Sequence, residues 1–114
     1  MMPSEPAAHE RRWARHKIDV RLKVSFPARG ETGPVFGRGN TLSQGGMGAF
    51  IPCSIAIGDR VLVEVTFPYS PTEVKLQAVV RSCEGFRYGL EFVDLRDEAR
   101  QIIVKNCGAA PHLQ

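Results

Sequence analysis

The sequence has no long apolar run and does not begin like a secreted protein. Its longest uninterrupted apolar stretches, such as residues 102–104, are far shorter than the roughly 18 residues that a membrane-spanning helix needs. Residues 1–13 contain no apolar stretch after their first charges, which is not the pattern of a secretion signal. We therefore expect a cytoplasmic protein with no membrane span.

Cysteine is scarce, and the sequence motifs of common enzyme classes are absent. Cys53, Cys83 and Cys107 are widely spaced, with no CxxC pair and no nearby histidine pair, so the sequence predicts free, buried thiols and no metal site. The chain also has no GxSxG nucleophile elbow, no GxxxxGK[ST] phosphate loop and no GxGxxG turn after a strand. These absences argue against an enzyme.

The residues that are present fit one small globular domain. The chain has 114 residues, of which 43% are hydrophobic and 24% charged, and both values are typical of a single folded domain. Its net charge of +3 is unevenly distributed. Residues 10–29 hold seven basic and two acidic side chains, a local charge of +5, so the rest of the chain carries −2. Basic charge gathered in one segment indicates a local anionic partner.

Apolar and polar residues alternate along most of the chain, which is the pattern of half-buried strands. Four clear runs and two shorter ones show it: residues 18–26, 35–41, 47–51, 61–67, 74–81 and 88–92. Turn-forming glycines and prolines separate these runs, with no helical pattern between them. The sequence therefore predicts an all-β fold, a six-stranded antiparallel β-barrel.

The periodicity changes near the C-terminus. Apolar residues follow helical spacing over residues 95–107, with Asp97 and Glu98 in the expected first turn. We expect Asp94 to be the N-cap and Gly108 to end the helix. The sequence thus predicts one C-terminal α-helix, packed on the barrel or across one of its openings.

Two arginines lie directly before the first predicted strand. Arg11 and Arg15 are four residues apart, so they share one side of an extended chain, about 13 Å apart, and are neighbours in a helix. A guanidinium can bond the O6 and N7 of guanine, grip a phosphate through two parallel bonds, or stack on a base. The pair suits a ligand with guanines and phosphates, although arginine pairs also commonly do no more than solvate a surface.

A polar, glycine-rich segment, residues 40–48, separates two predicted strands. Ser43 can bond nearby backbone there, and we expect Gly46 to take a positive φ. Such a segment lets a ligand approach the backbone closely. It equally fits a hairpin turn that binds no ligand.

Taken together, these two segments resemble the paired motifs of the PilZ family. Arg11 and Arg15 match RxxxR, and Ser43 and Gly46 match [D/N]xSxxG, in which Thr41 holds the first position. Three further segments are similar to the family and occur in its order: residues 18–24, 58–63 and 88–94. The resemblance covers about residues 10–107.

The resemblance implies a β-barrel that binds cyclic diguanylate (c-di-GMP), a bacterial second messenger. It implies that Arg11 and Arg15 hold guanine edges and phosphates, and that Thr41, Ser43 and Gly46 contact the other guanine. Binding is expected to change the conformation of the arginine-rich segment and to signal to a protein partner. The expected domain spans residues 9–107, with residues 1–8 and 108–114 as flexible tails.

The chain departs from the family pattern at position 41, where Thr41 replaces an aspartate or asparagine. A carboxylate or amide oxygen can accept from N1–H and N2–H₂ of guanine, whereas a hydroxyl offers a single, shorter contact. Asn40 comes one residue earlier, and on a regular strand it points to the opposite face, so we expect that it cannot substitute. Losing such a pair costs about 1–3 kcal/mol, which predicts weakened binding.

Two other interpretations stay open. One is a ligand-independent PilZ-like module that docks a protein, which Thr41 favours. The other is a barrel for single-stranded nucleic acid, because residues 84–92 weakly resemble the aromatic strand of RNA-binding sheets. Stacking aromatics must face outward, whereas the alternation places Tyr88 and Phe92 in the core. We therefore do not expect a nucleic-acid partner.

Overall fold

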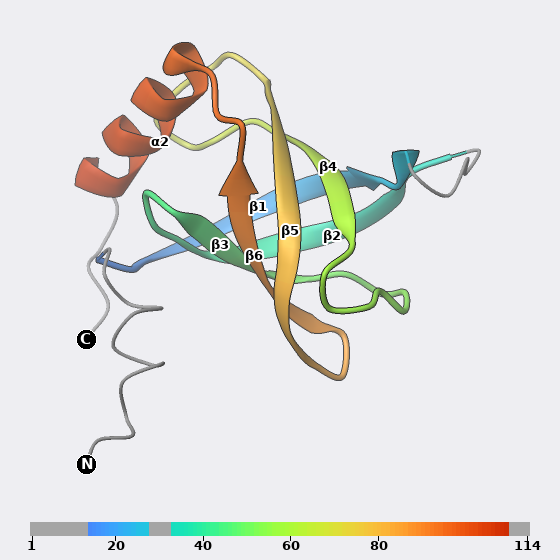
Figure 1. Ribbon diagram of the computed structural model, residues 1–114. Helices are drawn as coiled ribbons and strands as arrows, with labels where there is room; N and C mark the ends of the chain where they lie inside the picture. The colour runs from blue at the N-terminus through green and yellow to red at the C-terminus, as the bar shows by residue number, and fades with distance from the viewer. Residues whose placement is uncertain (1–13, 28–32, 110–114) are drawn as a thin grey trace.

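The computed structural model describes residues 14–27 and 33–109, which form a closed barrel of six strands followed by a helix (Figure 1). These elements are β1 (His16–Ser25), β2 (Val35–Leu42), β3 (Gly46–Phe50), β4 (Arg60–Val65), β5 (Val74–Glu84), β6 (Arg87–Val93) and α2 (Asp97–Ala109). The order around the barrel is β1-β2-β3-β6-β5-β4, and each neighbouring pair is antiparallel. The predicted six-stranded antiparallel barrel with one C-terminal helix is confirmed.

Alternating side chains fill the barrel interior, because successive residues of a strand point to opposite faces. In β1, Ile18, Val20, Leu22 and Val24 are buried while the residues between them are exposed. The same alternation in the other strands completes the core, whose largest fully buried side chains include Phe67, Leu22, Leu42, Ile51, Leu76 and Ile103. The apolar positions of the four clear runs are thus the core positions that the sequence predicts.

Pairing between β1 and β4 closes the barrel. Lys23 lies opposite Glu64 and Val24 opposite Val63. Glu64 also faces Lys75 of β5, and its carboxylate lies 3.4 Å from the Lys23 ammonium and 3.8 Å from that of Lys75. Because closure pairs the edge strands, it removes edges that would otherwise promote aggregation.

Helix α2 lies at one end of the barrel (Figure 1). Ala99, Ile103 and Cys107, four residues apart, form its buried face. It is set two residues later than predicted and includes Gly108, which was expected to end it and to belong to the tail. Asp94 is not the N-cap: it has a left-handed φ of 54°, and its carboxylate pairs with Arg60 at 3.3 Å.

The carbonyl of Arg96 accepts the first helical hydrogen bond, from the amide of Arg100. Arg96 is therefore the residue that precedes the helix. The predicted acidic first turn of Asp97 and Glu98 is confirmed.

Two buried polar side chains fasten loops to this framework. Asn106 accepts from the Tyr69 amide at 2.9 Å and donates to Ser70 Oγ and the Ile102 carbonyl. The Tyr88 hydroxyl accepts from the Ile55 amide and donates to the Cys53 carbonyl at 2.6 Å. Each side chain thus anchors a loop that lies outside the hydrogen-bond ladders of the strands.

The three cysteines form no disulfide bond, and their burial differs. Cys107 is buried, and desolvation raises the pKa of its thiol to about 11. Cys53 is half-buried, and Cys83 is exposed at the end of β5. The expectation of buried thiols is therefore correct for Cys107 and wrong for Cys83.

Within residues 14–27 and 33–109, no helix is both long and apolar enough to cross a membrane.

Candidate functional site

The turn between β2 and β3 is built by the side chain and backbone of Ser43. The Ser43 amide donates to the Gly46 carbonyl at 2.9 Å, and its hydroxyl oxygen accepts from the amides of Gly46 at 3.1 Å and Gly45 at 3.3 Å. The Gly45 carbonyl accepts from the Phe92 amide at 2.9 Å. These bonds fix the turn to the end of β6, near the start of α2.

Gly46 is required by close packing against β6. Its expected positive φ is wrong, because the positive-φ glycines of the described residues are Gly33, Gly58 and Gly85. A Cβ at Gly46 would instead lie 2.0 Å from the carbonyl oxygen of Leu90. The serine and the glycine of the motif therefore both serve to build the turn, whatever they do toward a ligand.

Arg15 and Ser43 both come directly after the last residue pair of β1 and β2. His16 pairs with Leu42 and Lys17 with Thr41, so Arg15 enters β1 at the end where β2 leads into the turn. Arg15 is half-buried, and it makes no hydrogen bond or ion pair with another described residue. One predicted arginine thus lies at the end of the β1–β2 pair from which the predicted turn starts, while Arg11 lies outside the described residues.

A β-bulge in β2 changes the direction of Asn40. Gly39 pairs with Ala49 and Thr41 with Gly48, so Asn40 is an extra residue relative to β3. Gly39 and Leu42 are both buried, whereas Asn40 is exposed and Thr41 half-buried. The expectation that Asn40 and Thr41 face opposite sides is wrong, because the bulge leaves both on the outer face of the barrel.

The hydroxyl of Thr41 is used within the protein. Thr41 Oγ1 accepts from the Gly48 amide at 3.0 Å. A Cβ at Gly48 would lie 2.6 Å from the same oxygen. Thr41 is therefore held against β3 and stabilises the bulge.

Small residues form the outer face next to Thr41. Thr41 pairs with Gly48, Gly48 with Gly89, and Gly89 with Ser82, a row that crosses four strands. Gly48 and Gly89 present no side chain there, and the side-chain oxygens of Thr41 and Ser82 lie where a Cβ at each glycine would point. Sequence reasoning missed this row, because strand registers bring its members together from distant segments.

Positive charge predominates where β1 meets the turn. Lys17 is exposed and lies opposite Thr41, two residues after Arg15. Of the nearby acids, Asp19 pairs with Arg38, whose guanidinium nitrogens lie 2.6 and 2.9 Å from one carboxylate oxygen. Glu91, opposite Gly46, pairs with Arg81. The nearby carboxylates are thus neutralised, and Arg15 and Lys17 can attract an anion.

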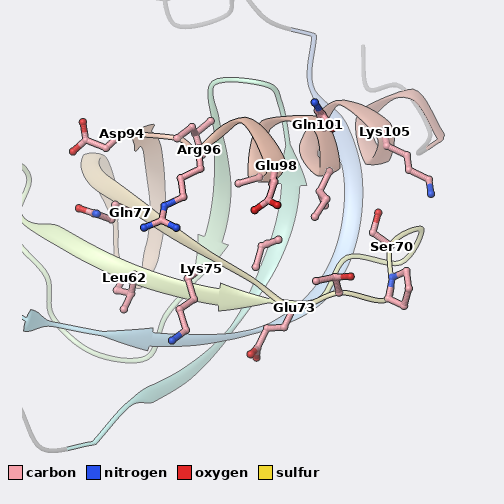
Figure 2. A pocket seen from close by; sticks show the side chains of 16 residues that line it. Leu62, Ser70, Glu73, Lys75, Gln77, Asp94, Arg96, Glu98, Gln101 and Lys105 are labelled. Atoms are coloured by element: carbon pink, nitrogen blue, oxygen red, sulfur yellow. The ribbon is translucent and has the colours of Figure 1, made fainter.

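A separate groove of about 760 Å³ lies between α2 and β5 (Figure 2). Figure 2 shows Arg96 and Glu98 extending from the start of α2 toward Lys75 and Gln77 of β5. Three acidic and three basic residues line it: Glu73, Asp94, Glu98, Lys75, Arg96 and Lys105. This balance gives no preference for an anion, and the groove does not include the Ser43 turn.

Residues 14–27 and 33–109 also bear on two other kinds of site, a metal site and an aromatic surface for nucleic acid. No group of three or more potential metal ligands lies together in this part of the chain. Tyr88 and Phe92 are buried, so they cannot stack on a nucleic-acid base. Phe36, Phe50 and Phe86 are exposed, and Phe50 and Phe86 pack edge to face with ring centroids 6.3 Å apart.

Solved structures of other proteins share this architecture, and three are compared with it. The inhibitor of motility MotI/DgrA of Bacillus subtilis has a TM-score of 0.70 at 15% identity, covering 87% of this chain and 50% of that one. The PilZ domain of Escherichia coli YcgR, solved with c-di-GMP, has a TM-score of 0.65 at 18% identity, covering 87% and 92%. The PilZ domain of CeSA from a cellulose-synthesizing bacterium has a TM-score of 0.65 at 17% identity, covering 83% and 96%.

At sequence identities of 15–18%, the similarity to these structures shows a shared fold. The chain spans half the length of the MotI/DgrA chain. No curated protein sequence matches it. Its sequence does match the PilZ domain over residues 9–108, nearly the whole chain. On this match and on the closed six-stranded barrel, the chain belongs to the PilZ domain family.

Proposed function

We propose that this protein is a non-enzymatic receptor for c-di-GMP, and that the ligand binds on the outer face beside the turn at residues 43–46. The observation that carries the proposal is the β1–β2 register, in which the last pair, His16 with Leu42, leaves Arg15 and Ser43 as the residues that follow at the same end of the two strands. Its support from related proteins is the PilZ domain match and the YcgR domain solved with c-di-GMP.

The roles proposed for the residues follow from their chemistry. Arg15, with Arg11, bonds guanine edges and phosphates through bidentate contacts, which are stronger than neutral hydrogen bonds. Ser43 and Gly46 shape the turn so that the other guanine can approach the backbone. Residues 9–107 form the binding domain, in the cytoplasm of a bacterium.

The proposed output is a change of surface that a protein partner reads. Binding changes the conformation of the arginine-rich segment that precedes β1, and a partner recognises the liganded form. Trp13 lies in this segment, so its fluorescence should shift when c-di-GMP is added.

A second candidate function is a PilZ module that docks its partner without a nucleotide. The observation that favours it is the Thr41 hydroxyl, which already bonds the Gly48 amide. A partner pull-down whose yield does not change with added c-di-GMP would support this second function.

Calorimetric titration with c-di-GMP separates the two. If the protein is the receptor, we expect measurable heat at about 100 μM ligand. Arg15→Ala should lose affinity by at least about fivefold, because a bidentate contact contributes about 1–3 kcal/mol. Arg87→Ala is the matched control, since Arg87 is exposed and pairs with Phe50, at the opposite end of β3 from Gly46. Absence of heat with the unmodified protein, or equal losses in both variants, would contradict the proposal.

A further inference from the structure

We infer that the protein has a second binding surface, on which an acidic amphipathic helix of a partner protein docks. Its centre is three exposed phenylalanines: Phe36 of β2, Phe50 of β3 and Phe86 of the β5–β6 hairpin. We call it the phenylalanine surface. The inference rests on the proposed function only in that a protein partner reads the domain, and its test needs no nucleotide.

The first observation is that exposed rings gather in one place. The chain has six phenylalanines, of which three are buried in the core and these three are exposed. Arg38 follows Phe36 by two residues on the same face and pairs with Phe50, so Phe36 and Phe50 are diagonal neighbours, about 7–8 Å apart. The rings of Phe50 and Phe86 are in edge-to-face contact, 6.3 Å between centroids. An apolar cluster left exposed on a folded domain marks an interaction site.

Backbone packing holds these rings in their positions. A Cβ at Gly37, next to Phe36, would collide with the carbonyl oxygen of Phe50, so β2 and the end of β3 approach closely there. The Ile51 amide donates to the Phe86 carbonyl at 3.0 Å, which ties the β5–β6 hairpin to the end of β3. The surface is therefore already arranged before a partner arrives, and this lowers the entropic cost of binding.

Basic residues flank the rings on both sides. The strand registers form one row across the sheet: Arg21, Arg38, Phe50, Arg87 and Glu84. Arg38 pairs with Asp19, whereas Arg21 and Arg87 make no ion pair with another described residue. Arg21 and Arg87 are three strand spacings apart, about 14 Å. Two available cations thus lie on opposite sides of an apolar centre, where they can pair with carboxylates.

This arrangement fits an α-helix with an apolar stripe and acidic flanks. The barrel is closed, so a partner cannot add a strand to a free edge and must bind through side chains. A helix with its side chains is about 10–12 Å wide, which fits between Arg21 and Arg87. Its apolar stripe would cover Phe36 and Phe50, and an apolar side chain can enter the open hollow of about 380 Å³ beside Phe50 and Phe86. Aromatic residues and arginine are the types enriched at the centres of protein interfaces.

A nucleic acid or a lipid surface fits these residues less well. The rings of Phe50 and Phe86 lie at 82° to each other, so they do not form the parallel faces on which successive bases stack. Glu84 lies opposite Arg87, and Asp19 pairs with Arg38. The surface therefore offers no continuous line of cations to a row of phosphates, and a protein partner is favoured.

The phenylalanine surface is separate from the proposed nucleotide site. Phe50 lies four residues along β3 from Gly46, about 13 Å at the usual strand rise. In Figure 1 the β5–β6 hairpin lies at the end of the barrel away from α2. Variants of the two sites can therefore be tested independently.

The test selects binders from random peptides displayed on phage, using the unmodified protein, and measures the affinity of one enriched peptide by fluorescence anisotropy. We expect enriched peptides with apolar residues at helical spacing and with aspartate or glutamate beside them. Phe50→Ser should weaken binding at least about tenfold, as for the central residue of an interface. Arg87→Glu should weaken it at least about fivefold. Exchanging one acidic residue of the peptide for lysine should restore binding to Arg87→Glu.

Two variants on α2 and beside it are matched controls. Val104 and Phe50 are both 42% exposed, so Val104→Ser removes an equally exposed apolar side chain elsewhere. Arg96→Glu reverses a charge in the α2 groove. Both should keep the peptide affinity within about twofold. All four replaced side chains are exposed, so the circular dichroism spectra should match that of the unmodified protein.

The outcomes separate this surface from the receptor function. If no acidic amphipathic peptide is enriched, or if Phe50→Ser binds the peptide as well as the unmodified protein does, the docking surface is wrong and c-di-GMP binding is unaffected. Phosphatidylglycerol vesicles and an oligothymidylate are tested in parallel; binding of either one that Phe50→Ser abolishes would also overturn the protein partner. If the unmodified protein does not bind c-di-GMP, the receptor function is wrong, while peptide binding that depends on Phe50 would still establish the surface.

Discussion

Ser43 and Gly46 in the β2–β3 turn contribute to the packing of the fold as well as to the proposed ligand site. Ser43 directs two backbone amides onto its own oxygen, and Gly46 admits the carbonyl of Leu90 where a side chain would collide. The motif that identifies the family is thus also the motif that closes this turn. A variant of either residue affects stability as well as binding, so binding losses there need a stability control.

Gly46→Ala should destabilise the fold. The new Cβ would lie 2.0 Å from a backbone oxygen, so β3 and β6 must shift, at a cost of about 1–3 kcal/mol. Urea unfolding followed by circular dichroism measures this cost. Gly108→Ala is the control, because a Cβ there meets nothing within 4 Å and alanine favours a helix by up to about 1 kcal/mol. Equal stability changes in the two variants would show that Gly46 is not held by close packing.

At the scale of elements, the sequence predicts what is local and repeated. Alternation over residues 18–26 gives the buried face of β1 correctly, because each side chain follows the two-residue period of a strand. The direction of Asn40 is not predictable in this way, since the bulge arises from pairing with β3. The same holds for Gly46, whose constraint comes from Leu90, more than 40 residues later.

The start of α2 also combines a local feature that the sequence predicts with a tertiary contact that it does not. Acidic residues in its first turn follow from the favourable interaction with the helix dipole, and the sequence predicts them correctly. Aspartate is a residue type that favours the N-cap position. Asp94 instead lies in the connection from β6 to α2, where its backbone is left-handed and its carboxylate pairs with Arg60 of β4. A tertiary contact therefore overrides a local preference.

Asn106→Leu should loosen the loop that follows β4 from the helix. The substitution keeps the number and branching of the side-chain heavy atoms but removes the acceptor of the Tyr69 amide and the donor to Ser70. Leaving such groups unsatisfied costs about 1–3 kcal/mol. Hydrogen exchange of the Tyr69 amide should accelerate and the Tm should fall. Lys105→Leu, an exposed neighbour, should change neither; unchanged exchange in Asn106→Leu would argue against this anchor.

At the scale of the whole molecule, the charge distribution and the strand topology point to the same face as the ligand site. The segment of residues 10–29 carries +5 and the rest of the chain −2. Part of that segment is β1, which the barrel places against β2 and its turn. The groove beside α2 is larger, but its charges balance. Both considerations favour the outer face of β1, β2 and β3 for a dianionic nucleotide.

The most direct measurement of this claim is a titration of ¹⁵N-labelled protein with c-di-GMP, followed by amide chemical shifts. We predict that the largest changes fall on residues 15–17 and 40–48, which surround the turn, and on Gly89, which pairs with Gly48. Small changes are expected at Lys75, Arg96 and Gln101 of the α2 groove. Changes centred on that groove, or no changes at all, would contradict the proposed site.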